Sequence, residues 1–293
     1  MTQTPRLLLD ARAELGEGPR WHEAEKRLYW VDIARNELHR LDPVTSQDEC
    51  RTFQSPIGCF AFMKEGGLML AMKDGFARLA HFDAQPEPFG EQIFSGSPDL
   101  RFNDGRTDRH GRFWAGSVNM LKSAHDAALY RLDSDGTVTQ VEGGMLTCNG
   151  AAFSPDGKHF YHTDTPSHTV RVYDYDETAG TLSHCRIFHQ FPMGKGRPDG
   201  ACVDVEGCYW TALFDGGRVV RLSPQGEILA QVALPAKRPT MIALGGPDLR
   251  TAYVTTARTG LSPEILAQEP FSGGIFCFDV EVAGMPETPF GTG

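Results

Sequence analysis

The sequence lacks the features that mark membrane, secreted and nucleic-acid-binding proteins. No stretch approaches the ~18 consecutive apolar residues of a membrane-spanning helix, and the apolar run at residues 7–9 is too short for a signal peptide. Basic residues are outnumbered by acidic ones, which gives a formal net charge of −10. That charge provides no basic face for nucleic acid or for an anionic membrane. We therefore expect a cytoplasmic protein that binds neither nucleic acid nor membrane.

Cysteine pairs and the common hydrolase motifs are also missing. The seven cysteines are odd in number, scattered, and never form a C-x-x-C pair, so we interpret them as reduced packing residues. The ten histidines include no H-x-H and no H-E-x-x-H motif. There is no G-x-S-x-G sequence, which disfavours a serine hydrolase. A packed or surface role is expected for His162 and His168, although both lie on one hairpin that could face a channel.

Helical periodicity is scarce, whereas a strand-turn-strand unit recurs along the whole chain. The unit contains a strand rich in Val, Tyr, Phe, Trp and Thr, bounded by Gly, Pro or Asp, which is typical of hairpins. This strand occurs six times, at residues 27–33, 67–73, 112–118, 159–165, 208–214 and 252–258. A further strand follows each of them, at residues 37–43, 76–83, 128–136, 169–176, 218–226 and 274–280.

Short strands that repeat every 40–50 residues are typical of β-propeller blades. The sequence therefore predicts an all-β fold, a six-bladed β-propeller with four-stranded blades, as a single domain over residues 1–293. The N-terminal strand at 5–11 has no unit of its own, and we expect it to close the last blade beside 274–280. A β-sandwich or another barrel is the alternative. Closed propellers protect their strand edges, so we expect a monomer.

The repeat also aligns one position in every blade. Eight residues before the turn that precedes each of the six strands, the sequence has Glu17, Gly58, Asn103, Asn149, Asp199 and Thr240. The first strand of a propeller blade lines the central channel, so these positions should face one another. Four of the six are Asp, Glu or Asn, whose oxygens are ligands for hard divalent cations. Gly58 brings no ligand and Thr240 a weak one, so a metal ion should lie off the axis, toward the other four blades.

Asp and Asn before Gly are also ordinary turn residues. The tripeptide Pro-Asp-Gly occurs twice, at 155–157 and at 198–200. The first copy lies between two predicted strands, so Asp156 is predicted to be a hairpin turn residue. The second copy precedes a first strand, so Asp199 is predicted to reach the channel.

Six segments of the chain resemble the gluconolactonase/senescence-marker-protein (regucalcin) family, and bacterial sugar lactonases such as xylonolactonases most of all. They are LGEGPRW (15–21), RFNDGRTDRHGRFWAGS (101–117), NGAAFSPDGKHFYHTDT (149–165), PDGACVDVEGCYWTAL (198–213), GGRVVRLSPQG (216–226) and GGPDLRTAYVTTAR (245–258). The resemblance covers essentially the full chain. It implies a six-bladed propeller with one divalent metal ion in its channel.

The resemblance also implies roles for individual residues. Glu17, Asn149 and Asp199 match the metal ligands of the family, the same three positions that the repeat had aligned. Arg101 and Asn103 match its substrate-binding pair; Arg101 could instead pair with Asp99 or Asp104. Animal members carry an acidic substrate contact shortly after the A-G-[ST] stretch, where this chain reads Val118-Asn119-Met120-Leu121. The substrates of those members are therefore not expected here.

The predicted function is hydrolysis of a small sugar lactone to the sugar acid by a metal-dependent hydrolase. Asp199 is expected to be both a ligand and the general base, or to orient the water, while Arg101 donates to sugar hydroxyls or to the developing oxyanion. The sequence leaves the ion open among Ca, Zn, Fe(II), Mn and Mg. An arylesterase or phosphotriesterase, and a non-catalytic metal-binding propeller, are the alternatives. Residues 119–127 interrupt the strand rhythm and could form a lid or specificity loop.

Overall fold

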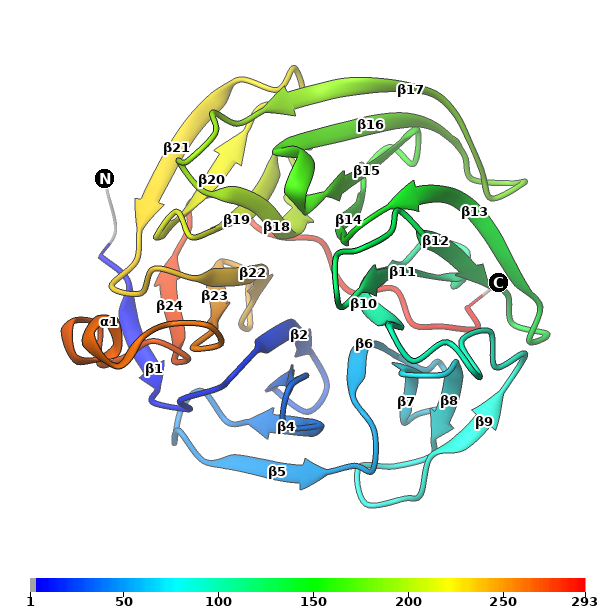
Figure 1. Cartoon of the computed structure of the whole chain (residues 1–293), viewed down its shortest axis with the longest axis horizontal. Helices are drawn as coiled ribbons and strands as arrows, with labels where there is room; N and C mark the ends of the chain where they lie inside the picture. Colours follow the sequence, from blue (N-terminus) through cyan, green and yellow to red (C-terminus); the bar gives the residue numbers. More distant parts are fainter. Residues whose placement is uncertain (1–3, 293) are drawn as a thin grey trace.

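The computed structural model describes residues 4–292 as six four-stranded antiparallel sheets arranged radially around a channel (Figure 1). This confirms the predicted six-bladed β-propeller and excludes the sandwich. One strand of each blade faces the channel, and these innermost strands are almost entirely buried. They are β2 (Gly16–His22), β6 (Ile57–Phe62), β10 (Leu100–Thr107), β14 (Cys148–Phe153), β18 (Arg197–Val203) and β22 (Pro239–Gly245).

The two middle strands of each blade agree closely with the twelve ranges expected from the repeat. The second strands are β3 (Arg27–Asp32), β7 (Leu68–Met72), β11 (Phe113–Asn119), β15 (His159–Asp164), β19 (Tyr209–Phe214) and β23 (Thr251–Thr256). The third strands are β4 (Glu37–Leu41), β8 (Phe76–Leu79), β12 (Ala127–Leu132), β16 (Thr169–Asp176), β20 (Arg218–Leu222) and β24 (Ile275–Asp279). Their buried side chains pack against the neighbouring blades and form the core.

One blade combines strands from both ends of the chain, and the N-terminal strand is its outermost one. β1 (Arg6–Leu9) pairs with β24, with Arg6 opposite Cys277, and so completes the sheet of β22 and β23. The other five outermost strands are β5 (Asp48–Thr52), β9 (Glu87–Phe89), β13 (Val138–Met145), β17 (Thr181–Gln190) and β21 (Ile228–Ala233). The ends of the predicted domain, residues 1 and 293, lie outside the described residues, and its extent stays a prediction.

Helical structure is confined to two short segments, η1 (Thr165–Ser167) and α1 (Pro263–Gln268), among residues 4–292. In that part of the chain, no helix has the length and apolar character needed to cross a membrane. All seven cysteines are free, and five of them are buried: Cys59, Cys148, Cys202, Cys208 and Cys277.

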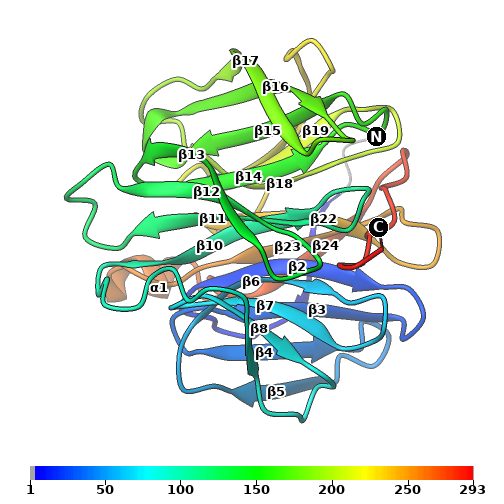
Figure 2. The same cartoon turned by 90° about the vertical axis from the view of Figure 1, so that its right-hand side faces the viewer.

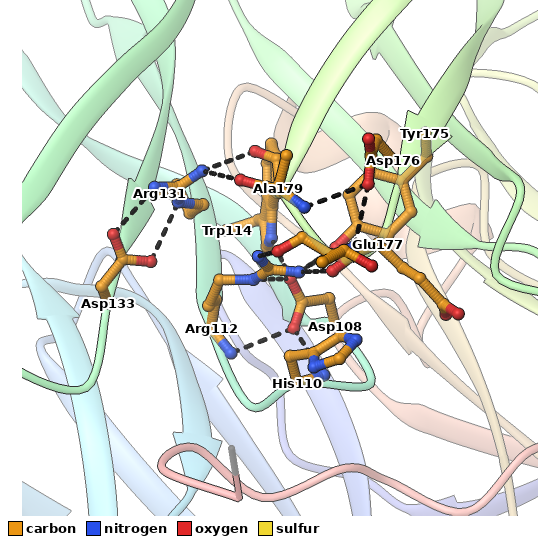
Figure 3. Close-up of polar contacts among 12 residues, drawn as sticks. Asp108, His110, Arg112, Trp114, Arg131, Asp133, Tyr175, Asp176, Glu177 and Ala179 are labelled. Atoms are coloured by element: carbon orange, nitrogen blue, oxygen red, sulfur yellow. Dashed lines mark hydrogen bonds and ion pairs between the residues drawn. The ribbon is translucent and has the colours of Figure 1, made fainter.

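Buried aspartates in the turns of two blades organise the packing between sheets. Asp108 Oδ2 accepts hydrogen bonds from Trp114 Nε1 at 2.9 Å, from Arg112 Nε at 2.6 Å and from Tyr175 Oη at 2.7 Å (Figure 3). Trp114 lies on β11 and Tyr175 on β16, so one carboxylate connects the third blade to the fourth. Asp204 accepts from Trp210 Nε1 at 3.0 Å in the fifth blade, within the same Asp-x-x-Gly-x-x-Trp sequence.

The C-terminal segment closes one end of the channel. It crosses behind the innermost strands in Figure 1, and Figure 2 shows it on the face opposite α1. Glu287 accepts hydrogen bonds from Arg20 Nη1 at 2.7 Å and from Arg106 Nη1 at 3.1 Å. Arg20 and Arg106 lie on the innermost strands β2 and β10, so this one carboxylate ties the C-terminal segment to two blades. The cavity that the predicted site residues line includes none of these three side chains.

Candidate active site

Every innermost strand is irregular at the position that the repeat had aligned. Its register with the next strand shifts between Glu17 and Arg20, Ile57 and Cys59, Phe102 and Gly105, Asn149 and Ala152, Pro198 and Ala201, and Pro239 and Met241. Such a bulge bends the strand and redirects the side chains beside it. Gly18 and Gly150 have φ angles of +58° and +64°, a conformation that residues with a side chain rarely adopt. The sequence Glu-Gly or Asn-Gly therefore supplies both the polar side chain and the backbone that turns it toward the axis.

All five predicted site residues line one cavity of about 520 Å³. Glu17, Asn103, Asn149 and Asp199 come from the innermost strands of four blades, and Arg101 lies two residues before Asn103 on β10. This volume lies within the ~300–1,000 Å³ typical of small-molecule sites. The rest of the lining is largely apolar, and includes Leu15, Ile33, Val118, Met120 and Phe214. The structure therefore brings the predicted residues together in a pocket large enough for a sugar-sized ligand.

The two aligned positions without a strong ligand do not face this cavity. A Cβ atom on Gly58 would lie 2.3 Å from the backbone of Phe102, so the glycine permits close packing between blades. Thr240 is buried, and its hydroxyl donates to the backbone oxygen of Gly16 at 2.5 Å. The four polar residues of the aligned positions therefore line the cavity from four blades, while their role as ligands stays a prediction.

Two carboxylates lie buried in the cavity without strong partners. Glu17 and Asp199 are 7% and 5% exposed. Burial and the neighbouring Asp199 and Asp104 raise the pKa of Glu17 well above its usual range. Burial and Asp104 likewise raise the pKa of Asp199, and the nearby cations Arg197 and Lys122 offset this only in part. Among residues 4–292, no side chain donates a hydrogen bond to either carboxylate.

A divalent cation fits this donor set. Glu17 and Asp199 together carry a charge of −2 when they are ionised, which matches the ion's charge and removes the cost of their burial. Both groups offer only oxygen atoms, the ligands that hard divalent cations prefer. Asn149 adds a neutral amide oxygen from the blade between them.

A chain of hydrogen bonds fixes the orientation of that amide. The carbonyl of Pro198 accepts from Thr165 Oγ1 at 2.9 Å, so Thr165 in turn accepts from Asn149 Nδ2 at 2.8 Å. Asn149 Oδ1 must therefore lie on the other side, where it accepts from Asn103 Nδ2 at 2.9 Å. One lone pair of Asn149 Oδ1 remains for a ligand in the cavity.

The same chain limits what Asn103 can do for a substrate. Both hydrogens of its amide are used, one toward Asn149 Oδ1 and one toward the backbone oxygen of Cys148 at 3.1 Å. Its oxygen accepts from Arg101 Nη1 at 3.0 Å and has one lone pair left. Asn103 can therefore accept a hydrogen bond from a substrate hydroxyl but has no donor to offer.

Arg101 is held by neutral oxygens. Its Nη1 also donates to the backbone oxygen of Phe102 at 2.7 Å, and it forms an ion pair with neither Asp99 nor Asp104. Burial lowers the pKa of Arg101 to about 10, so the guanidinium remains charged at neutral pH. Its other N–H groups donate to no protein group among residues 4–292 and are available to a ligand.

The predicted turn role of Asp156 agrees with its surroundings. Asp156 lies between β14 and β15, is exposed, and accepts from Ser154 Oγ and from the backbone nitrogen of Lys158. The two Pro-Asp-Gly copies thus occupy different environments, one in an external turn and one in the channel.

Sequence reasoning missed two cationic residues of the cavity, Lys122 and Arg197. Lys122 lies in the 119–127 segment, which had been singled out as a whole, and Arg197 lies two residues before Asp199. Position relative to the aligned ring could have indicated Arg197, since Arg101 likewise lies two residues before Asn103. No sequence signal indicated Lys122.

Histidines contribute nothing to the cavity lining. His162 is buried on β15, and burial lowers its pKa to about 3, so it is a neutral packing residue. A separate group of possible metal ligands, Glu37, His39 and Cys50, lies on the outer strands of the first blade. There His39 stacks on Trp30 and hydrogen-bonds Asp48 at 2.6 Å, which gives it a structural role.

Comparison with known proteins identifies the family of the chain. Residues 15–258 match the family model described as the SMP-30/Gluconolactonase/LRE-like region. The chain is 40% identical over 291 residues to 6-deoxy-6-sulfogluconolactonase from Pseudomonas putida, with 99% of each chain covered. It is 38% identical over 287 residues to a pentonolactonase from Haloferax volcanii, with 96% of each covered. The crystal structure of regucalcin from Agrobacterium tumefaciens, described as a calcium-binding protein, superposes with a TM-score of 0.94 at 27% identity, covering 98% of this chain and 97% of that one.

Proposed function

The chain belongs to the SMP-30/gluconolactonase/LRE-like family, and from that premise we propose that it opens sugar lactones to sugar acids with one divalent metal ion in its channel. It is a hydrolase that acts on carboxylic ester bonds, as its lactonase relatives are. The observation that carries the proposal is the meeting of Glu17, Asn149 and Asp199 in one cavity with Arg101 and Asn103. We take the monomeric state and the cytoplasmic location as part of the same proposal.

Glu17, Asn149 and Asp199 are the residues that would hold the ion. When bound, a divalent cation polarises a carbonyl oxygen and lowers the pKa of a water molecule from ~15.7 toward ~7. Three protein ligands leave coordination positions open, as in catalytic rather than structural sites. Regucalcin from Agrobacterium tumefaciens is described as calcium-binding, but all-oxygen sites accept Ca, Mg, Mn, Fe(II) or Zn.

The chain's own residues would act on the lactone as follows. Asp199 accepts a proton from the attacking water or orients that water, since its carboxylate lines the cavity and accepts no hydrogen bond from a protein side chain among residues 4–292. Arg101 donates its uncommitted N–H groups to the oxygen on which negative charge develops, or to a sugar hydroxyl. Asn103 accepts from a substrate hydroxyl and, through its amide hydrogens, keeps Asn149 in place.

The proposal is tested by assaying acid release from a panel of compounds in a weakly buffered solution. The panel contains pentono- and hexonolactones, aryl esters and organophosphate triesters, each with metal-free protein and with protein reloaded with one metal at a time. We expect the lactones to be hydrolysed with the highest kcat/KM and the metal-free protein to retain little activity. Preferential hydrolysis of aryl esters or triesters would favour the alternative hydrolase. Metal binding without any hydrolysis would favour a binding protein.

A further inference from the structure

Three cationic side chains line the same cavity as the two carboxylates: Arg101, Lys122 and Arg197. Arg101 and Lys122 form no ion pair with a carboxylate among residues 4–292; both donate to neutral oxygens instead. Lys122 Nζ lies 2.5 Å from Thr147 Oγ1. Arg101 is half-buried and Lys122 is exposed at the cavity. Cations that line a cavity without a directly paired carboxylate attract anionic ligands, so this cavity is suited to an anion.

Lys122 is aimed into the cavity by an ordered turn. Its backbone has a φ angle of +54°, and its N–H donates to the backbone oxygen of Asn119 at 3.1 Å. Asn119 Nδ2 donates to Asp126 Oδ1 at 2.8 Å, which ties the two ends of the 119–127 segment together. The ammonium group is therefore held at the cavity rather than carried on a free loop.

Within the described part of the chain, Arg197 forms an ion pair with one carboxylate, Asp215, and shares it with a second arginine. Asp215 binds Arg197 Nη2 at 2.6 Å through one oxygen and Arg238 Nε at 2.7 Å through the other. Both guanidinium groups also lie against the ring of Phe214, at 5.1 and 5.0 Å from its centroid. Two cations with one anion leave an excess positive charge at this wall of the cavity.

The two carboxylates of the lining offset two of its positive charges only while the metal ion is absent. Glu17 and Asp199 then offset the cations, and Asp199 lies close enough to Lys122 and Arg197 to interact with both. Under the proposed function these two carboxylates neutralise a divalent ion instead. The positive charges of Arg101 and Lys122 are then uncompensated, and that of Arg197 is compensated only in part because Asp215 also binds Arg238. A neutral lactone does not balance this positive charge.

We propose that the substrate is a sugar lactone that carries an anionic group, such as a sulfonate, phosphate ester or carboxylate, remote from its ring carbonyl, and that Lys122 and Arg197 bind this group. The inference rests on the proposed lactonase function and adds the substrate class. The cavity of about 520 Å³ accommodates such a substituent beside the sugar ring. Arg101 lies on the same strand as Asn103, and its remaining N–H groups are available to bind the lactone carbonyl.

The test compares glucono-1,5-lactone with the same lactone bearing a sulfonate, a phosphate or a carboxylate at C6, using metal-loaded protein at low ionic strength. We expect at least one anionic lactone to have a kcat/KM at least ~10-fold above the neutral one. This advantage should fall several-fold in ~0.3 M salt, because screening weakens charge attraction. The lactone with the highest kcat/KM identifies which anionic group the cavity prefers.

Variants assign the preference to residues. Lys122→Met and Arg197→Met should each reduce the ratio of anionic to neutral kcat/KM by at least ~10-fold, mainly by raising KM for the anionic lactone. Lys158→Met, which removes an exposed lysine from the turn beside Asp156, should leave the ratio unchanged.

Each remaining outcome overturns a definite part of the account. Neutral lactones hydrolysed as well as anionic ones, or a ratio that survives both substitutions, would refute the anionic substrate while leaving the lactonase proposal intact. Absence of hydrolysis of every lactone, with metal bound, would refute both.

Discussion

The side-chain amide of Asn103 donates a hydrogen bond of 2.9 Å to Asn149 Oδ1 across the boundary between the third and fourth blades. This contact orients the amide of one channel residue by means of another. It continues through Thr165 to the carbonyl of Pro198, the residue before Asp199. These hydrogen bonds connect three blades at the proposed metal site. A substitution of Asn103 should therefore affect metal binding as well as substrate binding.

Replacing Asn103 with Ala should therefore weaken metal binding although Asn103 is not one of the three proposed ligands. Without this donor, Asn149 keeps only its hydrogen bond to Thr165 and its Oδ1 loses direct support. Loss of such supporting hydrogen bonds typically costs ~10–100-fold in metal affinity. Calorimetric titration of metal-free protein measures this directly. Unchanged metal affinity, with only KM increased, would show that Asn103 serves the substrate alone.

Glu17→Gln should increase the stability of the metal-free protein and abolish the stabilisation that metal confers. Burial, and then the neighbouring Asp199 and Asp104, disfavour a charge on Glu17, and a neutral amide removes this cost. A gain of about 1 kcal/mol corresponds to a rise in Tm of ~2–4 °C for a protein of this size class. Thermal unfolding with and without metal gives both values. A lower Tm for the metal-free variant than for the metal-free wild type would contradict the account.

The preference for an anionic lactone should decline as the pH rises through about 8. Burial and the neighbouring Arg101 lower the pKa of Lys122 to about 8, Arg197 acts in the same direction, and Asp199 and Asp164 oppose them. A lysine with a lowered pKa loses its charge at a lower pH than usual, so attraction for the anion is present below this pH and lost above it. The pH profile of kcat/KM, corrected for spontaneous hydrolysis, reports the change.

A conservative variant separates this effect from other titrations. Lys122→Arg keeps a positive charge across the whole range, so the decline near pH 8 should disappear for the anionic lactone. A decline that persists in this variant would assign the titration to another group.

Asp108→Asn should destabilise the fold without changing the chemistry of the cavity. Asp108 is fully buried and accepts from Trp114, Tyr175 and the Arg112 guanidinium, so an uncharged amide leaves Arg112 without its ion pair (Figure 3). Breaking a buried pair of this kind costs ~3–5 kcal/mol, which urea unfolding measures.

The neighbouring ion pair provides the matched control for Asp108. Asp133 binds Arg131 at 2.8 Å and is partly exposed, so Asp133→Asn should cost less than ~1 kcal/mol. Equal losses for the two variants would contradict the role assigned to Asp108.

The repeat determined how much of this arrangement could be predicted from the sequence. It located the two middle strands of each blade and aligned Glu17, Asn103, Asn149 and Asp199, because buried strands and channel positions recur with a fixed spacing. Among the outermost strands the sequence predicted β1, which closes the last blade beside β24. The other five escaped prediction because most of their residues are exposed and follow no apolar alternation, as in β17. The closure of the channel by Glu287 depends on contacts across 181 and 267 residues, which no local pattern encodes.

The hydrogen bonds between side chains of the site could not be predicted from the sequence either. Hydrogen-bond chains such as Asn103–Asn149–Thr165 depend on which amide face meets which neighbour, and this is set by the bulges in β10 and β14. Lys122 reaches the cavity only through the positive φ of its turn. Sequence reasoning identified the polar residues that line the cavity but not the cations Lys122 and Arg197 beside them.

The most direct test of metal-dependent lactone hydrolysis in the channel uses the two Pro-Asp-Gly copies as a matched pair. The initial rate of lactone hydrolysis is measured for Asp199→Asn and Asp156→Asn, each freed of metal and then reloaded. The account predicts that Asp156→Asn matches the wild type, losing activity without metal and regaining it on reloading. It predicts that Asp199→Asn loses at least ~100-fold in kcat/KM and does not recover. Wild-type activity in Asp199→Asn, or equal loss in both variants, would contradict the account.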